Sequence, residues 1–83
     1  MDKVLVNLYV PMIEKSYSVW LPINKSIFCI ISLLTKAVKD INKGNYEIMK
    51  FPRLYNKNTA ETYMMNMIVK DTDIRNGTEL ILI

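Results

Sequence analysis

The sequence predicts an α+β domain in which one long helix packs on one face of a mixed β-sheet. Apolar residues alternate with period two near both ends of the chain, which is typical of half-buried strands. A single stretch, beginning near residue 24, follows the 3.6-residue period of an amphipathic helix instead. The chain has 83 residues, of which 51% are hydrophobic and 23% charged. A chain of this size closes one core, so we expect a single domain over residues 1–83.

The first two strands are predicted to form a hairpin. Alternation runs from Val4 to Val10, where Pro11 lacks a donor N–H and ends the strand. It returns over residues 17–21 after a loop of about five residues, and Pro22 closes the second strand. The positions expected to face the helix are Val4, Val6, Leu8, Tyr17, Val19, Leu21, Leu80 and Leu82.

The predicted helix has the clearest periodic pattern of apolar residues in the sequence. Its apolar positions recur at i, i+3, i+4 and i+7 from Ile27 to Ile41. Asn24 or Ser26 can cap the first turn by accepting a free backbone N–H. Gly44, with Asn45, can adopt the left-handed conformation that ends a helix.

The second half of the chain carries shorter signals. Residues 46–51 read as a short strand that Pro52 ends, residues 56–59 as a polar turn, and residues 62–65 as a very short strand. A tight turn at 71–73 brings Ile74 inward, and Asn76-Gly77 supplies positive φ values for a reversal. Residues 79–83 form the last strand. The predicted order is β-β-α-β-(β)-β, with four or five strands and with the first and last strands parallel neighbours.

This order of elements resembles the ubiquitin-like β-grasp fold, and so does the segment Asp73-Ile74-Arg75-Asn76-Gly77-Thr78-Glu79-Leu80-Ile81-Leu82. More narrowly, the chain resembles the small YukD/EsaB proteins of bacterial type VII (WXG-type) secretion systems, with which it also shares a Pro-initiated helix, Pro22-Ile23-Asn24-Lys25-Ser26-Ile27. The resemblance implies a cytoplasmic, non-enzymatic accessory or regulatory protein that acts through protein–protein contacts with secretion-system components. It implies no catalytic residue and no cofactor.

The composition independently disfavours several functions. The chain has no histidine and one cysteine, Cys29, which removes the common catalytic triads, an internal disulfide and the usual zinc sites. Its net charge is +3 with the lysines scattered, so we expect no nucleic-acid partner. The longest apolar run, residues 27–34, is far shorter than the roughly 20 residues of a membrane span, and no direct membrane insertion is expected.

Strand parity leads to the candidate binding site. Alternate positions on the strands must face away from the helix, and there the sequence is unusually apolar for a solvated sheet face. The predicted partner-binding residues are Leu5, Tyr9, Trp20, Ile81 and Ile83. This face is expected to bind a protein partner or to form a homodimer. The simpler interpretation is that Ile, Tyr and Trp suit strands wherever they point.

Two other functions stay open. One is a ubiquitin-like adaptor for a different machine, because a fold does not fix a function. The other is a sulfur-carrier-like protein that is adenylated at its C-terminus. Conjugated and sulfur-carrier relatives end in paired glycines, whereas this sequence ends Leu82-Ile83, so this function is disfavoured.

Overall fold

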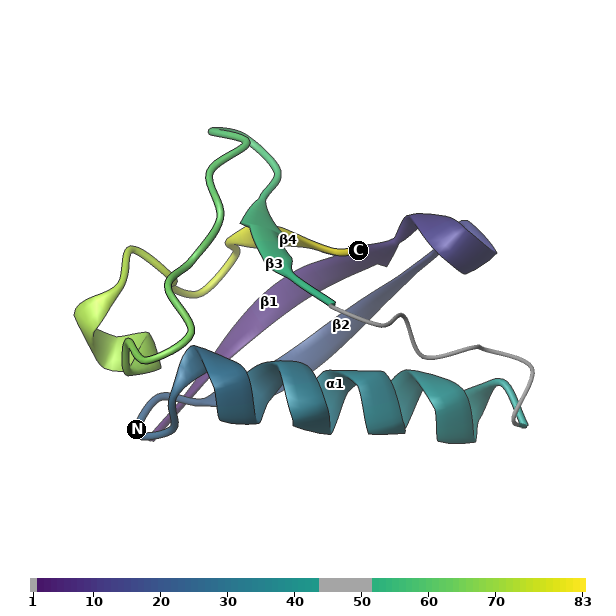
Figure 1. The fold of residues 1–83 in the computed structure, drawn as a ribbon, viewed down its shortest axis with the longest axis horizontal. Coiled ribbons are helices and arrows are strands. Elements are labelled where there is room, and N and C mark those ends of the chain that lie inside the picture. The colour runs from purple at the N-terminus through teal and green to yellow at the C-terminus, as the bar shows by residue number, and fades with distance from the viewer. Residues whose placement is uncertain (1, 44–51) are drawn as a thin grey trace.

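The computed structural model describes residues 2–43 and 52–83, which form one helix packed on a four-stranded mixed sheet (Figure 1). The elements in chain order are β1 (Lys3–Val10), the 3-10 turn η1 (Pro11–Ile13), β2 (Lys15–Pro22), α1 (Ile27–Ile41), β3 (Leu54–Asn56), the 3-10 turn η2 (Val69–Asp71) and β4 (Glu79–Leu82). The strand order is β2-β1-β4-β3, and β1 runs parallel to β4. The predicted α+β architecture and the ubiquitin-like β-grasp arrangement are confirmed.

The hairpin of β1 and β2 is regular along its whole length. Leu5 faces Trp20 and Asn7 faces Ser18 in an antiparallel register with no bulge. The connection is tighter than predicted, because η1 occupies three residues and Glu14 then adopts a left-handed φ of 52°. The Glu14 N–H donates to the Pro11 carbonyl at 3.1 Å, which closes the turn.

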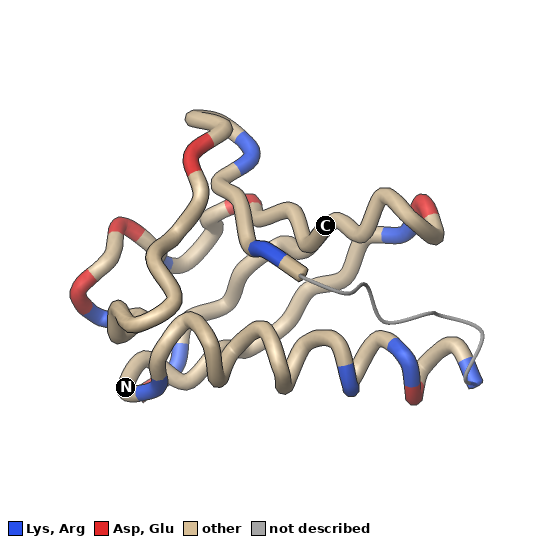
Figure 2. Tube along the Cα trace, viewed as in Figure 1, with Lys and Arg blue, Asp and Glu red and all other residues tan. Residues whose placement is uncertain are grey.

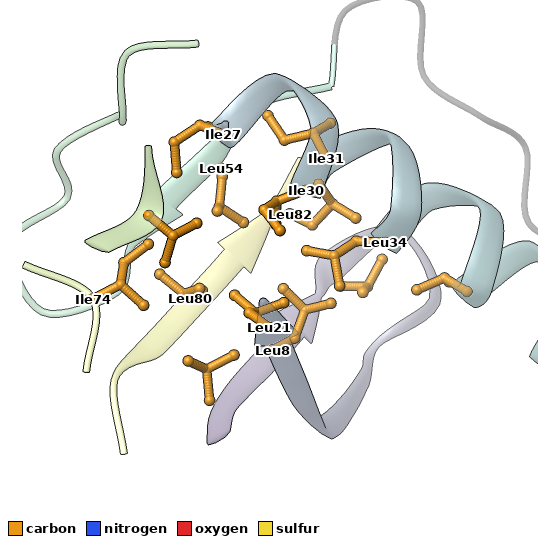
Figure 3. Packing of buried hydrophobic residues seen from close by; sticks show 14 residues of the cluster. Leu8, Leu21, Ile27, Ile30, Ile31, Leu34, Leu54, Ile74, Leu80 and Leu82 are labelled. Atoms are coloured by element: carbon orange, nitrogen blue, oxygen red, sulfur yellow. The ribbon is translucent and has the colours of Figure 1, made fainter. Parts of the chain in front are cut away.

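The core lies between α1 and one face of the sheet. Figure 3 shows Ile27, Ile30, Ile31 and Leu34 of α1 directed toward the strands, and all four are buried. From the strands the buried side chains are Val6, Leu8, Val10, Leu21, Leu54, Leu80 and Leu82. The predicted inward positions Val4, Tyr17 and Val19 pack against this core but are only partly buried. Each fully buried Leu or Ile contributes about 1.5–3 kcal/mol relative to exposure.

The ends of α1 distinguish between the caps that the sequence allowed. Ser26 is the N-cap, and its hydroxyl accepts from the Cys29 N–H at 3.2 Å. At the other end Asn42 is the C-cap and its amide side chain donates to the Val38 carbonyl at 2.8 Å. Lys43 follows with a left-handed φ of 54°. The predicted stop at Gly44 and Asn45 lies outside the described residues.

The chain after α1 departs from the predicted pattern. The strand predicted over residues 46–51 lies outside the described residues, and β3 is found beyond Pro52. The very short strand predicted over residues 62–65 reduces to a single bridge between Tyr55 and Thr62. β3 has no local sequence signal, because it is a strand through its pairing with β4.

The turn before β4 is anchored on β1. Gly77 alone carries the positive φ, 88°, whereas the sequence predicted positive values at both Asn76 and Gly77. The Thr78 N–H donates to the Arg75 carbonyl at 3.0 Å, as in a type II turn with Gly at its third position. Asn76 instead uses its side chain, whose Oδ1 accepts from the Leu5 N–H at 2.8 Å. Together with the hydrogen bonds from the Gly77 N–H to the Leu5 carbonyl, 2.8 Å, and from the Asn7 N–H to the Thr78 carbonyl, 3.0 Å, this contact ties the turn to β1.

Candidate functional site

The five predicted partner-binding residues all lie on the sheet face opposite α1, called here the outer face. Trp20 is 52% exposed, Ile83 46% and Leu5 36%. Tyr9 and Ile81 are partly buried and face one another across the β1–β4 pair. Their neighbours in sequence, such as Leu8, Leu80 and Leu82, are fully buried on the other side. The structure therefore places these residues where parity puts them, outside the core.

The outer face is divided rather than continuous. Leu5 and Trp20 face each other near one end of the hairpin, and we call them the Trp20 pair. Ser18, Asn7 and Glu79 lie side by side across β2, β1 and β4 in the middle of the sheet. The Ser18 hydroxyl donates to the Asn7 Oδ1 at 3.3 Å. This polar row separates the Trp20 pair from the remaining apolar residues.

The second apolar group includes a residue that the sequence did not reveal. Tyr55 in β3 pairs with Ile81, which in turn pairs with Tyr9. Ile83 continues β4, and its N–H and carbonyl exchange hydrogen bonds with Arg53 at 3.0 and 2.6 Å. We call Tyr9, Tyr55, Ile81 and Ile83 the Ile81 cluster. Tyr55 was missed because no strand was predicted at residues 54–56.

Charge is concentrated away from the centre of the sheet. Figure 2 shows few charged residues along β1 and β2, and a group of them at the C-terminal end of α1. Lys36, Lys39 and Lys43 lie there together with Asp40. The Lys15 Nζ at the start of β2 donates to the Asn42 Oδ1 at 2.9 Å, which ties the hairpin to the end of the helix. The helix end is thus a solvated cationic surface, distinct from the outer face.

A hollow of about 220 Å³ lies between the 56–67 segment and the 72–73 turn. At its wall the Tyr63 hydroxyl donates to the Asp73 Oδ1 at 2.6 Å and accepts from the Asn56 Nδ2 at 3.0 Å. Burial of the phenol and its hydrogen bond to Asp73 raise the pKa of Tyr63 to about 12. The phenol stays protonated at neutral pH, so it serves as a structural tie between two loops rather than as a base.

Chemistry-bearing side chains are sparse among the described residues. Residues 2–43 and 52–83 contain no group of three His, Cys, Asp or Glu side chains that could hold a metal ion. Cys29 is a partly buried free thiol on α1. Asp71 and Asp73 lie in turns, and Asp73 is engaged by Tyr63. Within the described ranges, α1 falls short of the length and apolar character that a bilayer span needs.

Comparison with known proteins identifies the fold but not a family. No protein-family model and no curated protein matches the sequence. The ubiquitin-like domain of the Mycobacterium tuberculosis type VII secretion system protein EccD1 matches with a TM-score of 0.78 at 11% identity, covering 100% of this chain and 99% of that one. A chain of a MycP5-free ESX-5 inner membrane complex matches with a TM-score of 0.73 at 12% identity, covering 99% of this chain and 21% of that one.

The same fold also occurs in a different assembly. A chain of a toluene 4-monooxygenase complex matches with a TM-score of 0.77 at 11% identity, covering 96% of this chain and 95% of that one. At such identities the likeness establishes the shared ubiquitin-like fold alone.

Proposed function

We propose that this protein is a non-enzymatic, cytoplasmic accessory or regulatory protein of a type VII-like secretion system, of the YukD/EsaB kind, and that it binds other components through its outer face. The observation that carries the proposal is the exposure of large apolar side chains on a sheet face that α1 leaves uncovered. The resemblance of two sequence segments to YukD/EsaB proteins points to a type VII-like secretion system. The structural likeness to the ubiquitin-like domain of EccD1, a type VII secretion system protein, supports the same assignment.

The outer face suits a protein partner on energetic grounds. Covering about 400 Å² of apolar surface yields on the order of 10 kcal/mol at about 25 cal/mol/Å². Much of this is offset by the translational and side-chain freedom that the partners lose. Such a face supports a specific but reversible contact, which suits an accessory protein better than a permanent subunit.

The divided face also constrains how the partner binds. An aromatic anchor such as Trp20 is typical of residues that dominate binding energy. The polar row of Ser18, Asn7 and Glu79 requires matching hydrogen-bond groups in the middle of the contact. We therefore expect the partner to present two apolar contacts separated by polar groups.

The experiment is affinity purification of the tagged protein from its native host, comparing the wild type with the double variant Trp20→Ser, Ile81→Ser. Membrane ATPase or channel components of the secretion system should be recovered with the wild type and lost with the variant. Phe28→Ser is the matched control, because Phe28 is 66% exposed but lies on α1, on the opposite side of the sheet. Equal recovery with all three proteins, or recovery of an unrelated machine, contradicts the proposal.

The second candidate is a ubiquitin-like adaptor of another machine, which the occurrence of this fold in a monooxygenase complex favours. The same purification distinguishes it, because the double variant would then lose components of that other machine. Sulfur-carrier activity is tested separately by the intact mass after incubation with ATP and an activating enzyme. A C-terminal adenylate or thiocarboxylate would overturn the non-enzymatic accessory role.

A further inference from the structure

The two edge strands of the sheet, β3 and β2, differ in whether a further segment of the described chain pairs with their free side. At the β3 edge the 61–63 segment returns along the strand, because the Asn56 N–H donates to the Glu61 carbonyl at 2.9 Å and the Tyr63 N–H to the Leu54 carbonyl at 3.2 Å. At the β2 edge no such segment is found among the described residues. Figure 1 shows β2 with β1 on one side only.

The hydrogen-bond pattern identifies which groups of β2 point outward. On β1, the Leu5 carbonyl and the Asn7 N–H bond toward the β4 side, at 2.8 and 3.0 Å. The N–H and carbonyl of one strand residue point the same way, so the alternate residues of β1 bond to β2. Val6 with Val19 and Leu8 with Tyr17 are therefore the hydrogen-bonded pairs. The backbone N–H and carbonyl groups of Ser16, Ser18 and Trp20 consequently point away from β1, in the plane of the sheet.

This open edge lacks the usual protection. Natural edge strands are blunted by charged side chains, proline, bulges or short length. Here the six residues from Ser16 to Leu21 carry no charge and no proline, and the hairpin register contains no bulge. Only Lys15 and Pro22 mark the two ends of the strand. A long, uncharged strand edge of this kind is a template for pairing with another strand.

We propose that β2 pairs antiparallel with β2 of a second copy of this chain, in a two-fold register centred on Ser18. Ser18 then faces Ser18 of the second copy, and Ser16 faces Trp20 of the second copy on either side of the axis. Each of these pairs exchanges two backbone hydrogen bonds. All three outward N–H groups are satisfied, and the two sheets join into one continuous sheet.

The side chains are compatible with this symmetry. On the inner face, Tyr17 lies opposite Val19 of the second copy, and aromatic with β-branched pairs are favourable across strands. Both side chains are only partly buried in the single chain, so pairing with a second copy buries more of their surface. The two Lys15 residues lie at opposite ends, roughly 20 Å apart along the strands at about 3.4 Å per residue. That exceeds the screening length of about 8 Å, so they do not repel appreciably.

Pro22 selects this register over the neighbouring one. Moving the axis to Val19 places Ser16 opposite Pro22 of the second copy, whose ring carbon occupies the position of an N–H. With the axis at Ser18, Pro22 lies beyond the paired segment.

The experiment measures self-association by analytical ultracentrifugation. Wild type should form a concentration-dependent dimer. Ser18→Lys and Ser18→Asp should each be monomeric, with the dissociation constant raised at least about tenfold, because like charges then face each other on the axis. An equimolar mixture of the two variants should restore the dimer. Ser16→Lys is the matched control, since residue 16 faces Trp20 rather than itself and its effect should be smaller.

Each result bears on the proposal. Ser18 is exposed and its backbone groups do not bond to β1, so circular dichroism should report a native fold in all variants. A wild type that is monomeric up to about 1 mM overturns the proposal, even if a strand of another protein binds there. A dimer that Ser18→Lys leaves intact, or that the mixture does not restore, overturns this register. None of these outcomes depends on the secretion-system role.

Discussion

Replacing Tyr63 by Phe removes the hydroxyl that ties the 56–67 segment to the turn before β4. In the native protein this hydroxyl donates to the Asp73 carboxylate at 2.6 Å and accepts from the Asn56 Nδ2 at 3.0 Å. The Asp73 side chain is exposed, so water replaces the lost donor and the cost there is about 1 kcal/mol. Asn56 is only 8% exposed, and its side-chain amide loses the Tyr63 hydroxyl as an acceptor, at a cost of about 1 kcal/mol.

The expected loss in unfolding free energy is therefore about 2 kcal/mol. For a domain of this size, 1 kcal/mol corresponds to about 4–8 °C, so the melting temperature should fall by about 8–16 °C. Tyr55→Phe is the matched control: Tyr55 is partly buried, and within the described residues its hydroxyl makes no hydrogen bond. Its melting temperature should stay within about 2 °C of the wild type.

The pH dependence provides a second test with a defined sign. The pKa of Tyr63 is raised to about 12 in the folded protein, against 10.0 for the free side chain. The contribution of the neutral phenol to stability is thus complete below pH 10 and is lost as the pH rises to 12. Two pKa units correspond to about 2.7 kcal/mol, which partial exposure of Tyr63 reduces to about 1–2 kcal/mol.

The assay is urea unfolding of the wild type and Tyr63→Phe at several pH values. The difference in unfolding free energy between them should shrink as the pH rises from 10 to 12. A melting temperature of Tyr63→Phe within about 2 °C of the wild type, with a difference that does not change with pH, refutes the reasoning.

Three further predictions concern stability and are measured by urea unfolding. Ser26→Ala should lose about 1 kcal/mol, because the Cys29 N–H loses its capping acceptor, whereas Asn24→Ala should leave stability nearly unchanged. Lys43→Gly should gain about 0.5–1 kcal/mol, because Gly adopts a φ of 54° without strain; a loss would show that the Lys43 side chain stabilises this helix end. Leu80→Ala should lose about 2–5 kcal/mol, because Leu80 is fully buried, and Ile81→Ala on the outer face should lose less than half as much. Similar losses for both would contradict the assigned parity of β4.

Much of the fold is encoded locally. The alternation of apolar residues in β1 and β2 and their helical period in α1 involve only side chains that are close in sequence. The buried faces and approximate limits of these elements are therefore predictable. The sequence does not predict which of Asn24 and Ser26 caps the helix, because both residue types can cap. Which one does so depends on where the helix docks on the sheet.

The remainder is set by contacts between distant segments. Leu54–Asn56 is a strand because β4 offers it partners, not because three residues favour extended structure. The same dependence explains the candidate site. Parity alone predicts which residues face outward, and it does so for Leu5, Tyr9, Trp20, Ile81 and Ile83. Only the register between strands reveals that Ser18, Asn7 and Glu79 align into a row and that Tyr55 joins Ile81.

The position of β4 has a consequence for how the domain is made. β4 is the last strand in sequence, yet it lies between β1 and β3 in the middle of the sheet. A nascent chain on the ribosome can form the hairpin and α1 early, but β1 and β3 gain their shared neighbour only when residues 79–82 have left the exit tunnel. Until then the leucines of the hairpin are accessible to chaperones, so the sheet is completed only after this late segment has emerged.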